Sequence, residues 1–478
     1  MIRKIYFMGI KGVGMASIAL IAKEAGFLVA GSDVENEFIT DHILKERNIQ
    51  VYTGFEKENV ADFFGSTPTN ECMMIITGAH QGFDNPESEF AASHNIKVIT
   101  HGEAVGLFMT GKLFERSDIE GISVSGSHGK TTISAMLATF LTKLDLHPSY
   151  SIGTSEINPI GAAGHFGSGK YFVAEADEYM AAPTIKKPKF LYQYPKYLII
   201  NNIDFDHPDF FADIEAVEAA FAQFIENLDS NGTLIVNGDD EGLKDLISKT
   251  QDLRVITYGT GEGNEFRISN FKQEGFSSQF SLSRSGVDLG EFKLSVPGYH
   301  NAKNVLAAVV LLIEIGISID KISKVLPEYS GSKRRLEMVG QTLNGAVLID
   351  DYAHHPEEIR KSLEAIKQAY PSKKITVIFQ AHTYGRTKSL EQEFISSFAG
   401  VNELIILPTF ASARSLVDKN LDEDLSFVEK IRALNPNVKL IENADDVVKY
   451  LTSLSSDSII LTMGAGDVYK VAVQLVNN

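Results

Sequence analysis

The sequence predicts an α/β protein of three domains in series, each built on a mainly parallel sheet. The chain has 478 residues, which is more than one core usually serves and fits roughly three domains. Short apolar strands alternate with helices along its whole length, as in parallel sheets covered by helices. Polar stretches separate the alternating blocks, and we place the domains at residues 1–112, 113–328 and 329–478.

The first domain begins with a strand, a glycine-rich turn and a helix. We expect the strand at 5–8, the turn at Gly9–Gly14 and the helix at 15–25. Further strands are expected at 27–30, 73–76 and 97–99. This alternation is typical of a doubly wound, Rossmann-like sheet.

The second domain repeats the pattern and then departs from it. A glycine-rich loop connects a strand at 121–125 to a helix at 131–144. Polar and apolar residues alternate over 265–296, which predicts antiparallel hairpins inserted in the parallel core. The remaining elements expected here are strands at 171–174, 197–201 and 233–236 and a helix at 301–315.

The third domain starts near Gly331 and returns to a regular alternation of strands and helices. Its strands are expected at 346–349, 375–379, 403–407 and 458–461. The pattern predicts a second Rossmann-like parallel sheet.

Composition excludes several classes of protein. The net charge is −18, and so acidic a surface repels nucleic acid, so we expect no nucleic-acid partner. No apolar run approaches the ~20 residues that span a bilayer, so we expect no membrane partner. The N-terminus lacks the small-residue cleavage site of a signal peptide. Cys72 is the only cysteine, which excludes an intramolecular disulfide and fits a cytoplasmic protein.

The most specific motif is ISVSGSHGKTT at 122–132, between an apolar strand and a helix. A phosphate chain needs small residues with converging backbone N–H groups, a helix N-terminus, a lysine and a hydroxyl for magnesium. Gly126, Gly129, Lys130 and Thr131 supply these parts, although Val124 stands where the usual spacing has a glycine. We interpret the motif as a P-loop that binds ATP; the alternative is a chance glycine-rich turn.

Two acidic clusters follow expected strand ends. FVAEADEY places Glu175, Asp177 and Glu178 after one strand, and NNIDFDHPDFF places His207 among aspartates after another. Strand C-termini face the ligand crevice in open parallel sheets, and carboxylates there can hold magnesium. An acidic strand end is more often unliganded and a lone histidine more often structural. Beside a P-loop, His207 becomes a candidate metal ligand.

Four further motifs are individually weak. Asn301 and Asn304 in VPGYHNAKN open a helix, where asparagine also serves as an N-cap. The adjacent cations Lys333, Arg334 and Arg335 could form a solvated face or bind phosphate at a domain junction. LIDDYAHHP and FQAHTYGRT place acidic, histidine and arginine side chains after two strands of the third domain.

Together and in this order, these motifs resemble those of the Mur ligases, the ATP-dependent amide ligases of peptidoglycan synthesis. The resemblance covers essentially the whole chain and rests on GIKGVGMASIA, GSD, GSHGKTT, EADE, NIDFDHPD, HNAKN, KRRLE, DDYAHHP and MGAGDVYK. It implies an ADP-forming enzyme that activates a carboxylate as an acyl phosphate and joins it to an amine. The implied cofactors are ATP and Mg²⁺.

The resemblance also implies roles for individual residues. The first domain would bind the UDP part of a UDP-sugar through Gly12, Val13, Gly14, Ser32 and Asp33. ATP would be bound through Gly126, Ser127, His128, Gly129, Lys130, Thr131, Thr132, Asn304, Arg335 and Asp351. The catalytic residues would be Lys130, Glu175 and His207. Thr131 and Glu175 would hold one magnesium ion, and His207 would bind or position a second near the acyl phosphate.

The nucleophile is less firmly implied. DDYAHHP and FQAHTYGRT resemble members that add L-alanine to UDP-N-acetylmuramate, and the carbamylated lysine of several other members has no candidate between His207 and Lys244. EADEYMAAPTIKKPKF instead resembles recycling members, which attach the preformed tripeptide L-Ala-γ-D-Glu-meso-diaminopimelate. We expect L-alanine, with the tripeptide as the alternative. Arg386 would then bind the alanine carboxylate, and Tyr352 and His354 would line its pocket.

Two other classes of function share parts of this sequence. GIKGVG, with Asp33 about twenty residues on, imitates the fingerprint of a nicotinamide-dependent oxidoreductase. Its glycines are spaced GxxGxG rather than GxGxxG, and that class leaves GSHGKTT without a role. A P-loop protein that only hydrolyses ATP would leave the first domain and the third-domain motifs without roles. We therefore prefer a ligase.

Overall fold

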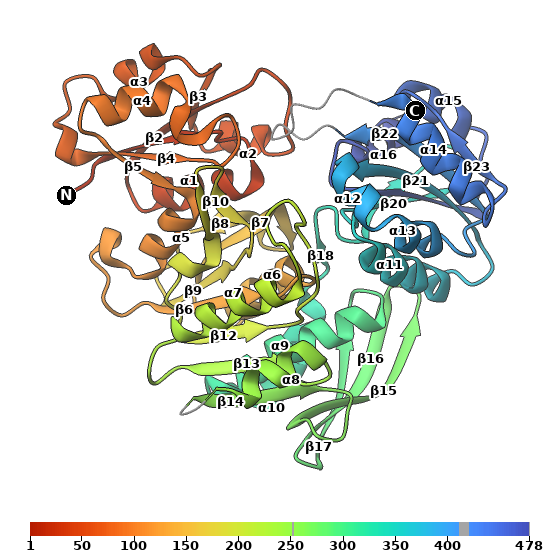
Figure 1. Ribbon diagram of the computed structural model, residues 1–478. Coiled ribbons are helices and arrows are strands. Elements are labelled where there is room, and N and C mark those ends of the chain that lie inside the picture. Colours follow the sequence, from red (N-terminus) through yellow and green to blue (C-terminus); the bar gives the residue numbers. More distant parts are fainter. Residues whose placement is uncertain (251–252, 411–419, 478) are drawn as a thin grey trace. The chain divides into compact units, whose positions relative to one another are not determined.

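The computed structural model describes residues 1–250, 253–410 and 420–477, which form three large sheets with helices between their strands and one small two-stranded sheet (Figure 1). The expected architecture of three sheets with mainly parallel strands is confirmed. The chain nevertheless divides into two compact units rather than three. These units are Met1–Asn270 with Phe280–Lys293 and Lys303–Ser330, and Phe271–Gln279 with Leu294–Ala302 and Gly331–Asn478.

The first sheet is parallel throughout, with the strand order β3-β2-β1-β4-β5. Its strands are β1 (Lys4–Met8), β2 (Leu28–Asp33), β3 (Gln50–Thr53), β4 (Cys72–Ile76) and β5 (Lys97–Thr100). Its helices are α1 (Val13–Glu24), α2 (Asp41–Glu46), α3 (Lys57–Phe64), α4 (Pro86–Ser93) and α5 (His101–Met109), with 3-10 turns η1 (Thr69–Glu71), η2 (Gly82–Asp84) and η3 (Lys112–Phe114). The turn after β1 lies where the strand order reverses, which is the ligand-binding position of open α/β sheets.

Helix α1 begins two residues earlier than the predicted start at 15. Gly14 suggests a turn in the sequence, yet it belongs to the helix, and its missing side chain leaves room for His101. A Cβ at position 14 would lie 3.0 Å from Nε2 of His101.

The second sheet runs in the order β17-β16-β15-β14-β13-β12-β6-β9-β7, with β8 paired to β7. Its strands are β6 (Glu120–Ser125), β7 (Ser149–Asn158), β8 (Gly161–His165), β9 (Tyr171–Glu175), β12 (Tyr197–Ile200), β13 (Thr233–Asn237), β14 (Arg254–Gly259), β15 (Phe266–Glu274), β16 (Ser277–Arg284) and β17 (Val287–Leu294). The hairpins expected over 265–296 are confirmed as β15 to β17, joined by turns at 275–276 and 285–286.

Helices and a small separate hairpin complete this second domain. The helices are α6 (Lys130–Lys143), α7 (Ile214–Glu226), α8 (Glu241–Ser248), α9 (Tyr299–Glu314) and α10 (Ile319–Val325), with 3-10 turns η4 (Lys189–Tyr192) and η5 (Leu326–Glu328). The hairpin is β10 (Met180–Ala182) and β11 (Ile185–Pro188). Helix α9 begins at Tyr299, so the predicted start at 301 is two residues late and neither Asn301 nor Asn304 is its N-cap.

The first two domains share a compact unit because α1 packs directly on the β7–β8 pair. A Cβ on Gly164 would lie 2.0 Å from the carbonyl oxygen of Ser17, so only glycine permits this approach. At the end of α1, Oε2 of Glu24 lies 2.7 Å from Nδ1 of His165 and accepts the backbone N–H of Phe166 at 2.9 Å. The sequence pattern contains no signal for this contact, because its partners come from separate domains.

The third sheet has the order β19-β20-β24-β21-β22-β23, and β19 is its one antiparallel strand among the described residues. Its strands are β19 (Glu337–Gln341), β20 (Val347–Asp351), β21 (Lys374–His382), β22 (Glu403–Phe410), β23 (Val438–Leu440) and β24 (Ser458–Met463), preceded in the chain by β18 (Gly331–Ser332). Its helices are α11 (Pro356–Ala369), α12 (Tyr384–Ser389), α13 (Glu391–Ser397), α14 (Leu421–Arg432), α15 (Ala444–Leu451) and α16 (Tyr469–Asn477). Separate apolar clusters cover its two faces, as in doubly wound folds.

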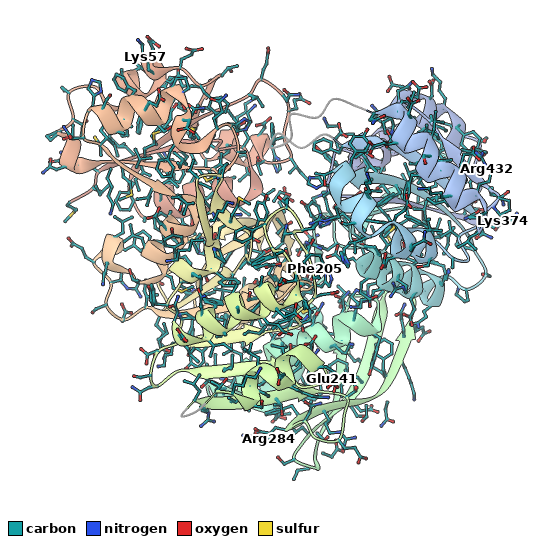
Figure 2. All side chains as sticks on the ribbon, in the orientation of Figure 1. Lys57, Phe205, Glu241, Arg284, Lys374 and Arg432 are labelled. Atoms are coloured by element: carbon teal, nitrogen blue, oxygen red, sulfur yellow. The ribbon has the colours of Figure 1, made fainter. Side chains whose placement is uncertain are left out.

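Charged side chains project from the outside of the first unit. Figure 2 labels Lys57, Glu241 and Arg284, and all three side chains are exposed to solvent. Among the residues that the structure describes, no helix combines the length and the apolar character needed to cross a bilayer.

Candidate active site

The glycine-rich loop connects the C-terminal end of β6 to the start of α6. Gly126 and Gly129 have φ angles of +128° and +87°, which other residues rarely adopt. A Cβ on Gly129 would also lie 2.7 Å from Nδ2 of Asn201 and 2.8 Å from Oδ1 of Asn304. Val124, the departure from the usual spacing, is buried inside β6, so it does not alter the loop itself. The loop therefore leads into the N-terminus of α6 as phosphate-binding loops do.

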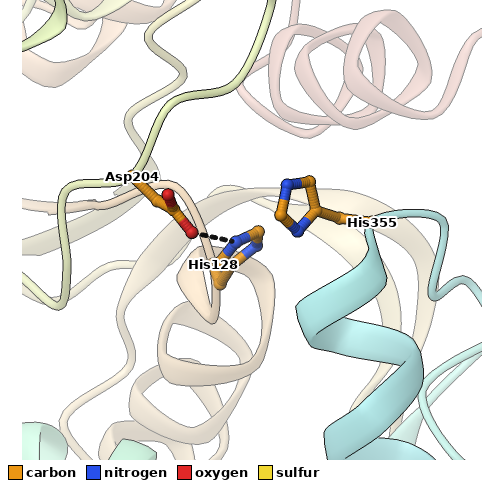
Figure 3. Close-up of side chains that lie close together, drawn as sticks. All are labelled: His128, Asp204 and His355. Carbon is orange, nitrogen blue, oxygen red and sulfur yellow. Dashed lines mark ion pairs between the residues drawn. The ribbon is translucent and has the colours of Figure 1, made fainter. Parts of the chain in front are cut away.

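Residues 202–204, which follow β12, form hydrogen bonds with this loop. Oδ1 of Asn202 accepts the backbone N–H of His128 at 2.7 Å, and the Asn202 amide donates to the His128 carbonyl at 3.0 Å. The hydroxyl of Ser127 accepts the backbone N–H of Asp204 at 2.8 Å. Figure 3 shows the ion pair between His128 and Asp204, whose closest atoms are 3.5 Å apart. The NNID motif thus fixes the shape of the loop.

Asn201 connects the loop to two other elements. Its Nδ2 donates to the carbonyl of His128 at 3.0 Å and to Oδ1 of Asn304 at 3.2 Å. Its Oδ1 accepts the hydroxyl of Tyr258 at 2.7 Å, and Tyr258 is buried. Sequence reasoning missed Tyr258, because a tyrosine in a strand is typical of an ordinary core position. Asn304, one of the residues expected to bind ATP, is therefore held by a hydrogen bond from Asn201.

Lys130 lies at the centre of the loop. Its Nζ donates to the carbonyl of Gly126 at 2.7 Å and pairs with the carboxylate of Glu178, the closest oxygen being 2.8 Å away. Burial alone would lower the pKa of Lys130, but the carboxylates of Glu178, Asp177 and Glu175 raise it above its usual range. Lys130 is therefore a cation that can hold the outer phosphates of a nucleotide.

Thr131 and Glu175 come together beside the loop. Thr131 Oγ1 donates to Oε1 of Glu175 at 3.1 Å, and the backbone N–H of Gly153 in β7 donates to Oε2 at 2.9 Å. A Cβ on Gly153 would lie only 2.8 Å from that oxygen. A hydroxyl and a carboxylate are hard oxygen donors of the kind that magnesium prefers, so this pair fits the ion.

His207 lies in a cluster with Asp177 and Glu178. One ligand atom each from Asp177, Glu178 and His207 lies within 4.8 Å of the other two. The ring of His207 packs against Tyr179, with centroids 4.6 Å apart. Asp177 pairs with Lys189 at 2.6 Å, and Lys189 and Lys130 hold the pKa of Asp177 below its usual range despite burial. An ion here would share its carboxylates with two ammonium groups, so this donor set fits magnesium less well.

The turn after β1 is held by the end of β2. The backbone N–H groups of Gly9 and Ile10 donate to the carbonyl of Ser32 at 2.8 and 3.1 Å. The carboxylate of Asp33 accepts the backbone N–H groups of Lys11 and Val34, both at 2.8 Å. Asp33 is 2% exposed, and burial raises its pKa. Its carboxylate therefore supports the turn from beneath, whereas a dinucleotide-binding protein needs this oxygen for a ribose hydroxyl.

The side chain of Ser32 is equally buried. Its hydroxyl donates to Oε2 of Glu87, and Oε1 of the same carboxylate accepts from Tyr6 at 2.8 Å and Asn59 at 3.0 Å. Glu87 is fully buried, which raises its pKa. Sequence reasoning missed Glu87, because a glutamate in the first turn of a helix is common on the surface. Gly12, Val13 and Gly14, the other residues expected to bind the UDP-sugar, are partly exposed at the start of α1.

In the second unit, the three adjacent cations have separate roles. Arg334 is buried and donates to Oδ2 of Asp350 at 3.0 Å and to the carbonyl of Gly466 at 2.9 Å. Lys333 pairs with Glu337 at 2.6 Å. Neither alternative, a solvated face or a phosphate site, fits Arg334, whose guanidinium joins β20 to the segment after β24. Arg335 lies over the ring of Tyr352, 5.1 Å from its centroid.

The other residues expected from the third domain lie at the ends of β20 and β21. Asp351 accepts the hydroxyl of Ser362 at 2.6 Å, and burial raises the pKa of Asp351 to about 6. The rings of Tyr352 and His354 meet edge to face with centroids 5.1 Å apart. Arg386 is buried in the short helix α12 after β21.

Three family profiles match the chain. Residues 4–113 match the "Mur ligase family, catalytic domain", residues 124–312 the "Mur ligase middle domain" and residues 334–466 the "Mur ligase, glutamate ligase domain". The UDP-N-acetylmuramate–L-alanine ligase of Desulfitobacterium hafniense is 35% identical over 474 residues, which cover 99% of each chain.

Solved structures give the same picture. The UDP-N-acetylmuramate-alanine ligase of Thermotoga maritima matches with a TM-score of 0.81 and 25% identity, over 99% of this chain and 98% of that one. The UDP-N-acetylmuramate:L-alanyl-gamma-D-glutamyl-meso-diaminopimelate ligase of Neisseria meningitides matches with a TM-score of 0.61 and 27% identity. That alignment covers 70% of this chain and all of the other.

Proposed function

We propose a function for this chain from one premise: it belongs to the Mur ligase family. We infer that it joins L-alanine to UDP-N-acetylmuramate, with cleavage of ATP to ADP, in the synthesis of peptidoglycan precursors. The observation that carries this proposal is the 35% identity over almost the whole chain to a ligase of that name. The family leaves no place for the nicotinamide-dependent oxidoreductase or for a protein that only hydrolyses ATP.

The three domains would divide the work. Residues 1–112 would bind the UDP-sugar, with Gly12, Val13 and Gly14 at the diphosphate and Ser32 and Asp33 supporting them. Residues 113–328 would bind ATP and magnesium, and residues 329–478 would bind L-alanine. The single cysteine supports a cytoplasmic location.

In the first step, a carboxylate oxygen of UDP-N-acetylmuramate would attack the γ-phosphorus of ATP. The bond to the bridging oxygen would break and ADP would leave, giving an acyl phosphate. The Nζ of Lys130 would stabilise charge that develops on the transferred group, as preorganised cations do. Magnesium held by Thr131 and Glu175 would neutralise phosphate charge.

In the second step, the amino nitrogen of L-alanine would attack the acyl carbon. The carbon–oxygen bond would break, phosphate would leave with its electron pair, and the nitrogen would lose a proton to give the amide. The Arg386 guanidinium would hold the alanine carboxylate, since it pairs with carboxylates through two hydrogen bonds. Tyr352 and His354 would line the pocket for L-alanine. His207 would help to position the acyl phosphate.

The tripeptide is the competing nucleophile, supported by EADEYMAAPTIKKPKF and by the likeness to the Neisseria enzyme. An assay of ADP release with UDP-N-acetylmuramate and ATP, against a panel of amino acids and the tripeptide, tests the proposal. We expect continued ADP release over many turnovers only when UDP-N-acetylmuramate and L-alanine are both present. Release that depends on the tripeptide and ignores L-alanine would support the recycling activity. Release without any acceptor would contradict both.

A further inference from the structure

We propose that strand β7 joins the two substrate sites, and that Ser151 and Ser17 are positioning residues that hold these sites in register. This inference rests on the proposed function, which assigns the turn after β1 to the UDP-sugar and Glu175 to the ATP side. It concerns residues that have no place in the chemistry itself.

One end of the connection is the hydroxyl pair formed by α1 and β7. Ser17 Oγ donates to the carbonyl of Gly14 at 2.9 Å and lies 2.8 Å from Oγ of Ser151. Either hydroxyl can be the donor in the bond between Ser17 and Ser151. Both serines are at least nine-tenths buried, so water does not compete for these bonds.

The other end lies two residues further along the same strand. The backbone N–H of Gly153 donates to Oε2 of Glu175, whose Oε1 accepts the hydroxyl of Thr131. A short piece of one strand therefore contacts the first turns of α1, through Ser17, and the carboxylate beside the P-loop. Strand β8 adds to this, because Gly164 lets it lie directly against the backbone of Ser17.

We expect this connection to affect the rate of the reaction and not the affinity for ATP or for the UDP-sugar. The carboxylate of one substrate must reach the γ-phosphorus of the other, and a displacement of about 1 Å can cost roughly 100-fold in rate. Each site, however, keeps its own binding groups when the hydroxyl bridge is removed. Loss of the bridge should therefore lower kcat while leaving KM for ATP and for the UDP-sugar nearly constant.

The test compares Ser151→Ala with a matched control, Ser149→Ala. Ser149 lies on the same strand, is 1% exposed, and accepts the backbone N–H of Gly167 at 3.0 Å, within the β7–β8 pair. We expect Ser151→Ala to lower kcat about tenfold with both KM values within about twofold. Ser149→Ala should lose similar thermal stability with kcat unchanged. Equal kcat values in the two variants would overturn the proposal.

A double variant and hydrogen exchange complete the test. Ser17→Ala with Ser151→Ala should cost no more in kcat than either single change, because both remove one bridge; additive losses would contradict it. Backbone N–H groups of residues 14–17 should exchange faster in Ser151→Ala than in Ser149→Ala, and equal exchange would overturn the link. If the wild-type protein does not ligate L-alanine, the proposed function fails, whereas the exchange comparison still decides on the link.

Discussion

Replacing Gly153 by alanine should disturb the magnesium requirement without unfolding the protein. The added Cβ would lie 2.8 Å from Oε2, 3.2 Å from Cδ and 3.3 Å from Oε1 of Glu175. Non-bonded heavy atoms are comfortable at about 3.5 Å, so the carboxylate must retreat by roughly 0.7 Å. Because the contact is with the end of a flexible side chain, we expect stability to fall by less than about 1 kcal/mol.

The retreat would break the geometry around Glu175. Its hydrogen bond from Thr131 is already 3.1 Å long, and a further 0.7 Å, taken from the same estimate, would put it beyond hydrogen-bonding distance. Loss of a partner that orients a metal ligand typically costs 10–100-fold in metal affinity or activity, and we expect about tenfold here. The concentration of magnesium at half-maximal ADP formation should rise by that factor.

The assay is a magnesium titration of ADP formation at saturating ATP, with thermal unfolding measured in parallel. Gly263→Ala is the matched control, because a Cβ at that position would meet open space among the described residues and its φ is ordinary for any residue. Superimposable titrations for Gly153→Ala, the control and the wild type would refute the role of Glu175 as a magnesium ligand. A large loss of stability would refute the reasoning about the flexible carboxylate.

Three further substitutions test other parts of the structure. Arg334→Met should lower the free energy of unfolding in urea by about 3–5 kcal/mol, because the buried carboxylate of Asp350 loses its cation. Adding Asp350→Asn to the same chain should restore much of this loss, and an unchanged unfolding midpoint for Arg334→Met would show that Arg334 is not structural. Tyr258→Phe leaves the buried Oδ1 of Asn201 without its donor, so the free energy of unfolding should fall by about 1–3 kcal/mol. Steady-state kinetics should show a higher KM for ATP, with the KM values of the other substrates unchanged. Arg386→Ala should raise KM for L-alanine by at least tenfold, the scale of a lost charge-assisted bond; a rise in KM for ATP instead would place Arg386 at the nucleotide.

The features that could be predicted from sequence are those encoded within a few neighbouring residues. The P-loop is one, since a strand, two glycines, a lysine and a hydroxyl within eleven residues suffice to define it. The alternation of strands and helices is another, and it correctly indicated three sheets. The start of α1 was predicted two residues late, because Gly14 resembles a turn residue in the sequence, whereas in the fold its missing side chain leaves room for the distant His101.

Features that depend on long-range partners could not be predicted in this way. Tyr258 reaches Asn201 across 57 positions, and Ser32 reaches Glu87 across 55. Nothing near any of these residues distinguishes it from an ordinary strand or helix position. Arg334 shows the opposite error, since a conspicuous run of cations suggested a phosphate site where one guanidinium is used to hold the sheet together. A sequence motif indicates which chemical groups are present, whereas burial and hydrogen-bond partners determine which of these groups can still bind a ligand.

The close approach of α1 to β8 also determines which pieces of such a chain can be exchanged between related proteins. The sequence suggests a boundary at residue 112. A first domain grafted from another protein must nevertheless place its first helix as close to Gly164 as α1 lies here, where a Cβ on Gly164 would be 2.0 Å from the carbonyl oxygen of Ser17. A foreign helix with a slightly different path would collide there, and no rotamer change could relieve it because both partners are backbone. Strands β7 and β8 belong to the same sheet as β6 and β9, so the unit that can be transplanted is the first two domains together.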